Sequence, residues 1–125
     1  MLFESTEIRC LVLKNRFVRS ATWEGLANED GSCTSRLIDL MAELAMGGVG
    51  LIISGHAYVS REGQASLRQL GIYDDRLLPD LIEMADAVHR EGGKIAVQLA
   101  HGGCHGAIKI TGLETQGPSV PDETR

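Results

Sequence analysis

The segment Gly92–Gly103, with the sequence GGKIAVQLAHGG, decides the fold of this chain. Its leading glycine pair is typical of a helix end, because glycine adopts the left-handed conformation at the C′ position. The apolar run Ile95–Leu99 is short and flanked by glycines, which favours a buried β-strand. Gln98 and His101 place polar side chains near the end of that strand. This arrangement is typical of parallel-sheet enzymes, whose sites lie where the strands end.

Two more strands and two helices are predicted before this segment. One buried helical face is indicated by the spacing of Leu37, Leu40, Met41, Leu44 and Ala45. The continuous run Val49–Ile53 indicates a strand buried on both faces. We therefore predict strands near residues 16–20, 49–53 and 94–99, and helices near residues 35–46 and 77–91. Such strand–helix–strand units need right-handed crossovers, so the predicted fold is α/β, with the three strands parallel and adjacent in that order.

The remaining segments frame this βαβαβ unit, which occupies residues 14–107 of a single predicted domain. Residues 1–13 alternate weakly between apolar and polar and indicate a short hairpin. Residues 54–76 are predicted to form a long connection, and connections of that length inside compact domains are usually functional. Residues 108–125 show no clear period and are predicted to be a loop or tail.

Composition narrows the class of function. The 125 residues suffice for one compact domain but are half of the roughly 250 that an eight-stranded α/β barrel needs. The net charge of −5 is spread over interspersed acidic and basic residues, so we expect neither a nucleic-acid partner nor a membrane. The N-terminus has no signal-peptide pattern. The three widely spaced cysteines indicate reduced thiols, and we expect a cytoplasmic protein.

Four segments carry a resemblance to a known family. Lys94–Gly103 resembles the K-I-x-x-Q-L-x-H-x-G segment of the Old Yellow Enzyme family, and Leu13–Val18, Gly47–Ile53 and Ala87–Gly92 match it in the right order. These proteins are FMN-dependent NAD(P)H:flavin oxidoreductases and ene-reductases built on a TIM barrel. The resemblance implies the N-terminal portion of such a barrel, about three βα units. It also implies FMN as cofactor, NADH or NADPH as electron donor, and a small electrophilic substrate.

The resemblance also implies a flavin pocket. In the family, the glutamine matching Gln98 hydrogen-bonds the pyrimidine edge of the flavin, and a glutamine amide offers both a donor and an acceptor there. The alternative for Gln98 is a core amide satisfied by neighbouring backbone. Ala21 and Thr22 match a loop that turns backbone groups towards the flavin. Gly55 and His56 are predicted to follow the second strand, where a small residue contacts the flavin.

The chain departs from the family pattern near this pocket at Ala21, where proline is usual, at His56, where alanine is usual, and at two further positions. Trp23 stands where the family often has a threonine or cysteine that tunes the flavin, and Cys104 stands where an arginine is common. The resemblance also implies that the family's catalytic residues, and the loops that hold the FMN phosphate, lie in segments beyond Arg125. No catalytic residue is therefore assigned within the chain. We expect the isolated chain to be inactive.

Two other functions stay open at this point. One is a non-catalytic barrel fragment that needs a partner or the missing C-terminal half of the barrel, and a homo-oligomer is an open alternative to a monomer. The other is a metal-binding module, because imidazole and thiolate ligands suit zinc. Its ligands would be His56, His101, Cys104 and His105. Their spacing is not that of a standard zinc finger, and we expect no metal.

Overall fold

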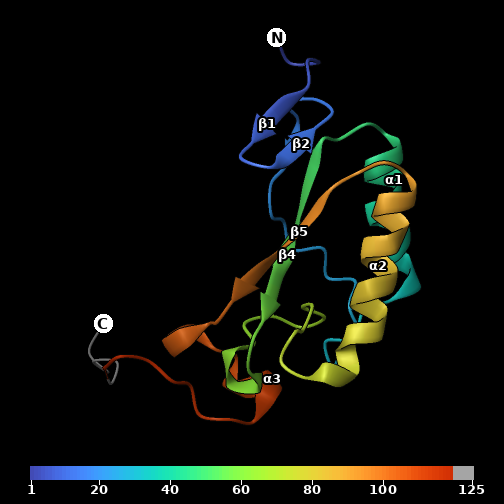
Figure 1. The fold of residues 1–125 in the computed structure, drawn as a ribbon. Coiled ribbons are helices and arrows are strands. Elements are labelled where there is room, and N and C mark those ends of the chain that lie inside the picture. The colour runs from blue at the N-terminus through green and yellow to red at the C-terminus, as the bar shows by residue number, and fades with distance from the viewer. Residues whose placement is uncertain (120–125) are drawn as a thin grey trace.

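A three-stranded parallel sheet forms the centre of the computed structural model, which describes residues 1–119 (Figure 1). Its strands are β3 (Val18–Arg19), β4 (Leu51–Tyr58) and β5 (Ile95–Ala100), in that order across the sheet. Both neighbouring pairs are parallel. The predicted α/β fold and strand order are therefore confirmed.

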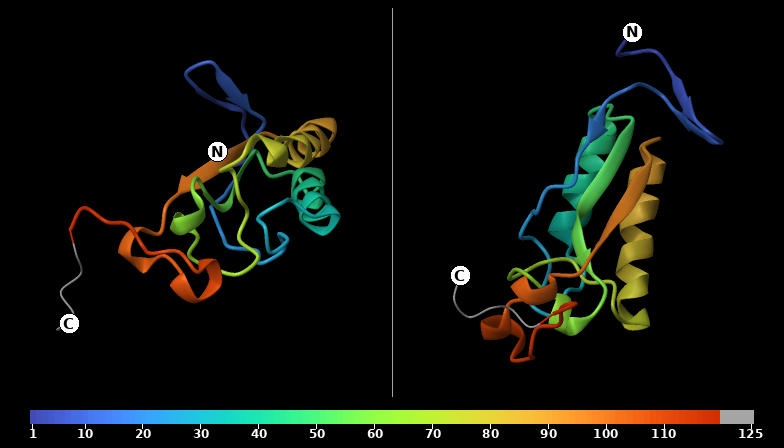
Figure 2. Two further views of the ribbon diagram at one scale, coloured as in Figure 1. Left: turned by 90° about the horizontal axis from the view of Figure 1, so that it is seen from below. Right: turned by 90° about the vertical axis from the view of Figure 1, so that its left-hand side faces the viewer.

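Two helices lie side by side on one face of this sheet (Figures 1 and 2). Helix α1 spans Ser35–Met46, as predicted, and α2 spans Leu78–Arg90, one residue shorter at each end than predicted. The Thr34 hydroxyl caps α1 by accepting a hydrogen bond from the Leu37 N–H at 3.2 Å. None of the helices within residues 1–119 has the length and apolar character needed to span a bilayer.

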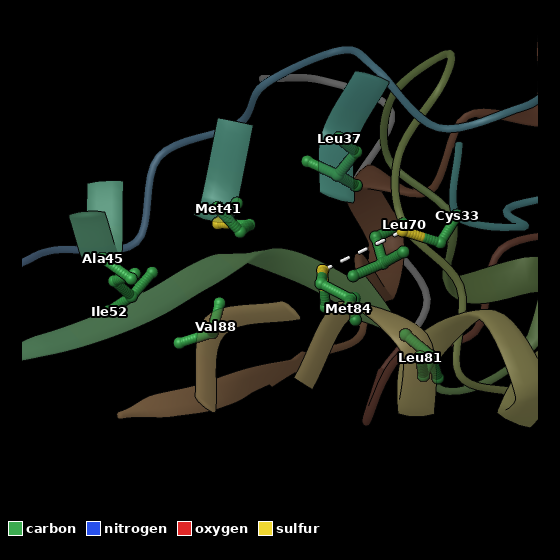
Figure 3. Close-up of a cluster of buried hydrophobic side chains, with 10 residues drawn as sticks. Cys33, Leu37, Met41, Ala45, Ile52, Leu70, Leu81, Met84 and Val88 are labelled. Atoms are coloured by element: carbon green, nitrogen blue, oxygen red, sulfur yellow. Dashed lines mark hydrogen bonds between the residues drawn. The ribbon is translucent and has the colours of Figure 1, made fainter. Parts of the chain in front are cut away.

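The hydrophobic core fills the space between these helices and the sheet (Figure 3). Its apolar positions on α1 and α2 recur at the spacing of one helical face, which explains why the sequence pattern located both helices. The cluster consists of Cys33, Leu37, Met41, Ala45, Ile52, Ala57, Leu70, Leu81, Met84 and Val88. The packing of α1 and α2 against one face therefore stabilises the sheet.

A small antiparallel hairpin precedes the sheet. Strand β1 (Thr6–Ile8) pairs with β2 (Leu11–Leu13), and Arg9 in the turn has a positive φ of 55°. Figure 1 shows the hairpin beyond the end at which β4 begins. The hairpin predicted within residues 1–13 is confirmed.

The strand boundaries differ from the prediction in two places. The first strand contains only Val18 and Arg19, whereas β4 begins two residues later than predicted and continues five residues further, to Tyr58. Gly55 and His56 therefore lie within β4 rather than after it. The extension follows from a β-bulge, seen as a register shift between Ile53 and His56, which accommodates the polar residues that resembled a turn.

The connection after β4 is correspondingly shorter than the predicted span 54–76. It contains the 3₁₀ turns Arg61–Gly63 and Asp75–Leu77. It also returns to the sheet, because Tyr58 forms a parallel bridge with Gly71 and stacks on the Tyr73 ring at a centroid distance of 5.1 Å.

The burial predicted for the third strand was wrong. β5 lies at the edge of the sheet and has β4 as its only neighbouring strand within residues 1–119. Leu99 is exposed, and so are Ala96 and Gln98, which project from the face of the sheet opposite to that of Ile95 and Val97, the residues packed on the core. The strand is therefore accessible on the side that faces away from β4.

The predicted tail, residues 108–125, is only partly a loop. A short helix, α3 (Ile108–Thr111), occupies its first residues, and Gly112 ends this helix in the left-handed conformation. Residues 120–125 lie outside the described part of the chain. The resemblance implies that the catalytic residues lie beyond Arg125. Their position therefore stays a prediction.

Candidate functional site

Gln98 and His56 lie side by side near the C-terminal ends of β5 and β4. They are partners in the parallel register, so their side chains project from the same face of the sheet. The Gln98 side chain is exposed and makes no hydrogen bond to any other residue between 1 and 119. Gln98 is therefore not a satisfied core amide. Its donor and acceptor are both available to a ligand.

Ser54 holds the backbone of Gln98 in place. This serine is buried in the bulge of β4, with 1% of its surface exposed. Its hydroxyl donates to the Gly55 carbonyl at 2.9 Å and accepts the Gln98 N–H at 3.3 Å. The sequence analysis missed Ser54, although a serine–glycine pair in an apolar strand is a signal for a bulge.

An ion pair fastens the loop after β3 to the neighbouring strand. Arg19 Nη1 lies 2.8 Å from Glu24 Oε1, and the two side chains are only 17% and 7% exposed. Arg19 also donates to the carbonyls of Ile53 at 3.0 Å and Thr22 at 3.3 Å. Glu24 Oε1 accepts the Gly55 N–H at 3.2 Å. The sequence analysis did not single out either charged residue.

This loop explains why position 55 is a glycine. A Cβ atom there would lie 2.7 Å from the Thr22 carbonyl oxygen and would collide with the Glu24 carboxylate. Thr22 is exposed, and its hydroxyl donates to the Ser20 carbonyl at 3.1 Å. The structure thus places the loop that carries Ala21 and Thr22 against Gly55. Gly55 is next to His56, which pairs with Gln98, so the five candidate residues lie on three adjoining segments.

A second contact joins the two turns that follow β4 and β5. The His101 ring packs so closely on Gly63 that a Cβ atom there would lie 2.6 Å from its Cδ2. His101 Nδ1 accepts the Gly103 N–H at 2.9 Å, which leaves Nε2 facing Glu62 Oε1 at 3.7 Å. Hydrogen bonding to its own backbone N–H lowers the pKa of the Glu62 carboxyl, and nearby His101 acts in the same direction. The Gly102 N–H donates to the Gly63 carbonyl at 2.8 Å.

The four residues of the metal alternative are not brought together. Between residues 1 and 119, no three His, Cys, Asp or Glu side chains are placed to share a metal ion. His101 is instead engaged with the turn beside it, and His56 lies next to Gln98 on the sheet. Cys104 is an exposed free thiol.

Comparison with known proteins identifies the family. Residues 1–124 match the model of the NADH:flavin oxidoreductase / NADH oxidase family. The chain belongs to this family. It is 42% identical over 120 residues to an NADH oxidase of Thermoanaerobacter brockii, covering 94% of this chain and 18% of that protein. It is 35% identical over 119 residues to a 4,4'-dithiodibutanoate disulfide reductase of Rhodococcus erythropolis, covering 95% of this chain and 29% of that protein.

Solved structures of NADH:flavin oxidoreductase relatives resemble the chain over most of its length. An Old Yellow Enzyme homologue from Zymomonas mobilis aligns with a TM-score of 0.86 at 28% identity, over 96% of this chain and 33% of that one. A 2-naphthoyl-CoA reductase aligns with a TM-score of 0.85 at 29% identity, over 90% of this chain and 17% of that one. The family resemblance and the N-terminal portion of a TIM barrel are confirmed. The chain spans no more than a third of these relatives.

Proposed function

We propose that this chain supplies part of the isoalloxazine pocket of an FMN-dependent NAD(P)H oxidoreductase with ene-reductase-like activity. The observation that carries the proposal is the Gln98 amide, which is exposed beside His56 and unpaired within residues 1–119. The pyrimidine edge of a flavin presents alternating carbonyls and an N–H. A glutamine amide complements such an edge because it donates and accepts side by side.

The other candidate residues fit the same ligand. Ser54 fixes the backbone from which Gln98 projects, and Gly55 lets the loop that carries Ala21 and Thr22 approach β4 closely. His56 lies beside Gln98 and can contact the flat ring system. When bound, FMN supplies hydride transfer between NADH or NADPH and a small electrophilic substrate. The role of this chain is to bind and orient the flavin ring.

In our proposal, the NAD(P)H oxidoreductase activity requires residues in addition to those of this chain. The resemblance puts the catalytic residues and the phosphate-binding loops beyond Arg125, and the chain spans 18% of the Thermoanaerobacter brockii NADH oxidase. TIM barrels commonly bind phosphate near their last two strands. The three cysteines are free thiols, which supports a cytoplasmic location.

Lumiflavin, an isoalloxazine without a phosphate, tests the proposal directly on this chain. It is titrated into the protein while backbone and side-chain amides are followed by NMR. We expect Gln98→Leu to weaken binding by about five- to 150-fold, because two neutral hydrogen bonds of about 0.5–1.5 kcal/mol each are lost. Gln116→Leu is the matched control, since Gln116 is exposed and is not one of the five candidate residues. Equal lumiflavin affinities for the two variants would reject the flavin role of Gln98.

A further inference from the structure

The parallel ladder between β3 and β4 ends at Arg19, two residues before Ala21. Val18 pairs with Leu51 and Arg19 with Ile52. In a regular parallel ladder the next step would come from Ala21, whose N–H would donate to the Ile53 carbonyl and whose carbonyl would accept the Gly55 N–H. Neither bond is present, because β3 ends at Arg19.

The ion pair occupies both of these positions on β4. Arg19 Nη1 donates to the Ile53 carbonyl at 3.0 Å, and Glu24 Oε1 accepts the Gly55 N–H at 3.2 Å. A cation and a carboxylate thus replace the N–H and the carbonyl of Ala21. The pair satisfies the groups of β4 with charge-assisted bonds, and each charge neutralises the other where both are largely buried.

As a consequence, the backbone N–H and carbonyl of Ala21 are not used by the sheet. Its N–H and carbonyl make no backbone hydrogen bond to any residue between 1 and 119, although the residue is half-buried. The carbonyls on either side of it are occupied. The Ser20 carbonyl accepts the Thr22 hydroxyl, and the Thr22 carbonyl accepts Arg19 Nη2. Backbone groups that have no protein partner can bind a ligand, since each N–H is a donor and each carbonyl an acceptor.

We propose that Arg19 and Glu24 are positioning residues that keep the Ala21 peptide out of the sheet, so that its N–H and carbonyl can bind the polar edge of the flavin. This inference rests on the proposed function. The pair touches no cofactor itself. It acts by competing with Ala21 for the Ile53 carbonyl and the Gly55 N–H.

The double variant Arg19→Ala/Glu24→Ala tests the proposal, because it removes both charges and leaves neither one buried alone. In the ligand-free chain we expect the Ala21 amide to exchange its hydrogen rapidly. In the double variant Ala21 joins the ladder, and its exchange slows by about tenfold or more. Lumiflavin affinity falls by about fivefold or more. A purely structural role would give faster exchange after the pair is removed.

Two control variants separate positioning from general destabilisation. Asp74→Ala/Arg76→Ala removes an exposed ion pair, whose charged atoms lie 3.8 Å apart, together with the Asp74 cap on the Arg76 N–H and the Arg76 bond to the Tyr73 hydroxyl. We expect both readouts to stay unchanged. Glu24→Gln keeps an oxygen for the Gly55 N–H but leaves the Arg19 charge without its partner, so we expect lumiflavin affinity to fall less than in Glu24→Asp. If the double variant does not fold, Glu24→Asp gives the same test. Its shorter side chain does not reach Gly55, and lumiflavin binding weakens about threefold or more.

The two readouts also distinguish this inference from the proposed function. A chain that binds no lumiflavin overturns the flavin proposal, whereas Ala21 exchange still reports whether the pair controls the loop. A protected Ala21 amide in the original chain overturns the positioning role. Unchanged exchange in both the double variant and Glu24→Asp overturns it as well.

Discussion

Burial separates one of the three thiols from the other two. Cys33 is 7% exposed and its Sγ lies 3.9 Å from the sulfur of Met84 in the core (Figure 3). Burial raises the pKa of the Cys33 thiol from 9.0 to about 12, and the negative charges of Asp80 and Glu83 act in the same direction. Cys10 and Cys104 are exposed. Only those two thiols can therefore form reactive thiolates on the folded protein.

We expect a thiol-specific disulfide reagent to label two cysteines of the folded chain at about pH 8 and the third only in denaturant. The raised pKa of Cys33 also determines the direction in which the stability of the protein changes with pH. The folded state favours the neutral thiol of Cys33. The contribution of Cys33 to the free energy of unfolding is therefore fully present below pH 9.0 and is lost as the pH rises towards about 12. In Cys33→Ala, the free energy of unfolding should fall less steeply with pH over this alkaline range. Fast labelling of all three thiols on folded protein would contradict the burial of Cys33.

At the scale of elements, α1 depends on its first turn. The Thr34 hydroxyl accepts the Leu37 N–H and also donates to the Leu26 carbonyl at 2.6 Å. The same side chain therefore begins the helix and holds the preceding loop against it. Leu37, Met41 and Ala45 on the buried face of α1 then carry the helix into the core.

Thr34→Ala removes both bonds, and we expect the free energy of unfolding to fall by about 1–2 kcal/mol. Thr34→Ser keeps the hydroxyl and should lose less than about 0.5 kcal/mol. Urea denaturation followed by circular dichroism measures the difference. If the alanine and serine variants unfold at the same urea concentration, the cap is not what stabilises this end of α1.

At the scale of the whole molecule, the three-stranded sheet has two open edges within residues 1–119, at β3 and β5. Leu99 on β5 is 65% exposed, and Phe17 and Val18 beside the other edge are also exposed. In a closed barrel such edges are paired, and residues 1–119 by themselves have neither the burial nor the neighbouring strands that closure provides. This arrangement supports our proposal that the isolated chain does not turn over NAD(P)H.

We expect FMN to bind this chain no more than about threefold tighter than lumiflavin, because charge-assisted phosphate bonds of about 1.5–3 kcal/mol each would be missing. Anaerobic addition of NADPH should leave the flavin absorbance unchanged. Both ligands are compared by fluorescence titration under the same conditions. Sub-micromolar FMN binding with bleaching would show that the chain, alone or as paired copies, builds a complete site.

The elements that the sequence predicted well are those with a period. The spacing of Leu37, Met41 and Ala45 located α1 because a helix buries one face at every third or fourth residue. The end of β4 was missed because Gly55 and His56 look like turn residues, and only the bulge keeps them in the strand. The exposure of β5 was missed because an apolar run does not reveal whether a neighbour covers it.

Some residues of the candidate site could be predicted from the sequence and others could not. The sequence motif identified Gln98, and the structure shows its amide exposed and next to His56. Its flavin contact stays a prediction. Arg19 and Glu24 were missed because they are five residues apart in an aperiodic loop, and their partners on β4 lie more than 30 residues away. Such a pair is visible only once the strands are placed.

The contact between His101 and Gly63 has a consequence for loop engineering. The turn 61–64 and the turn 101–107 share the His101 ring packing and two hydrogen bonds, from Gly102 N–H to the Gly63 carbonyl and from Ala107 N–H to the Gln64 carbonyl, both 2.8 Å long. A graft that transplants one turn from a relative, with any larger residue at position 63, collides with the imidazole of the other. The two turns are therefore one exchangeable module, to be recombined together or not at all.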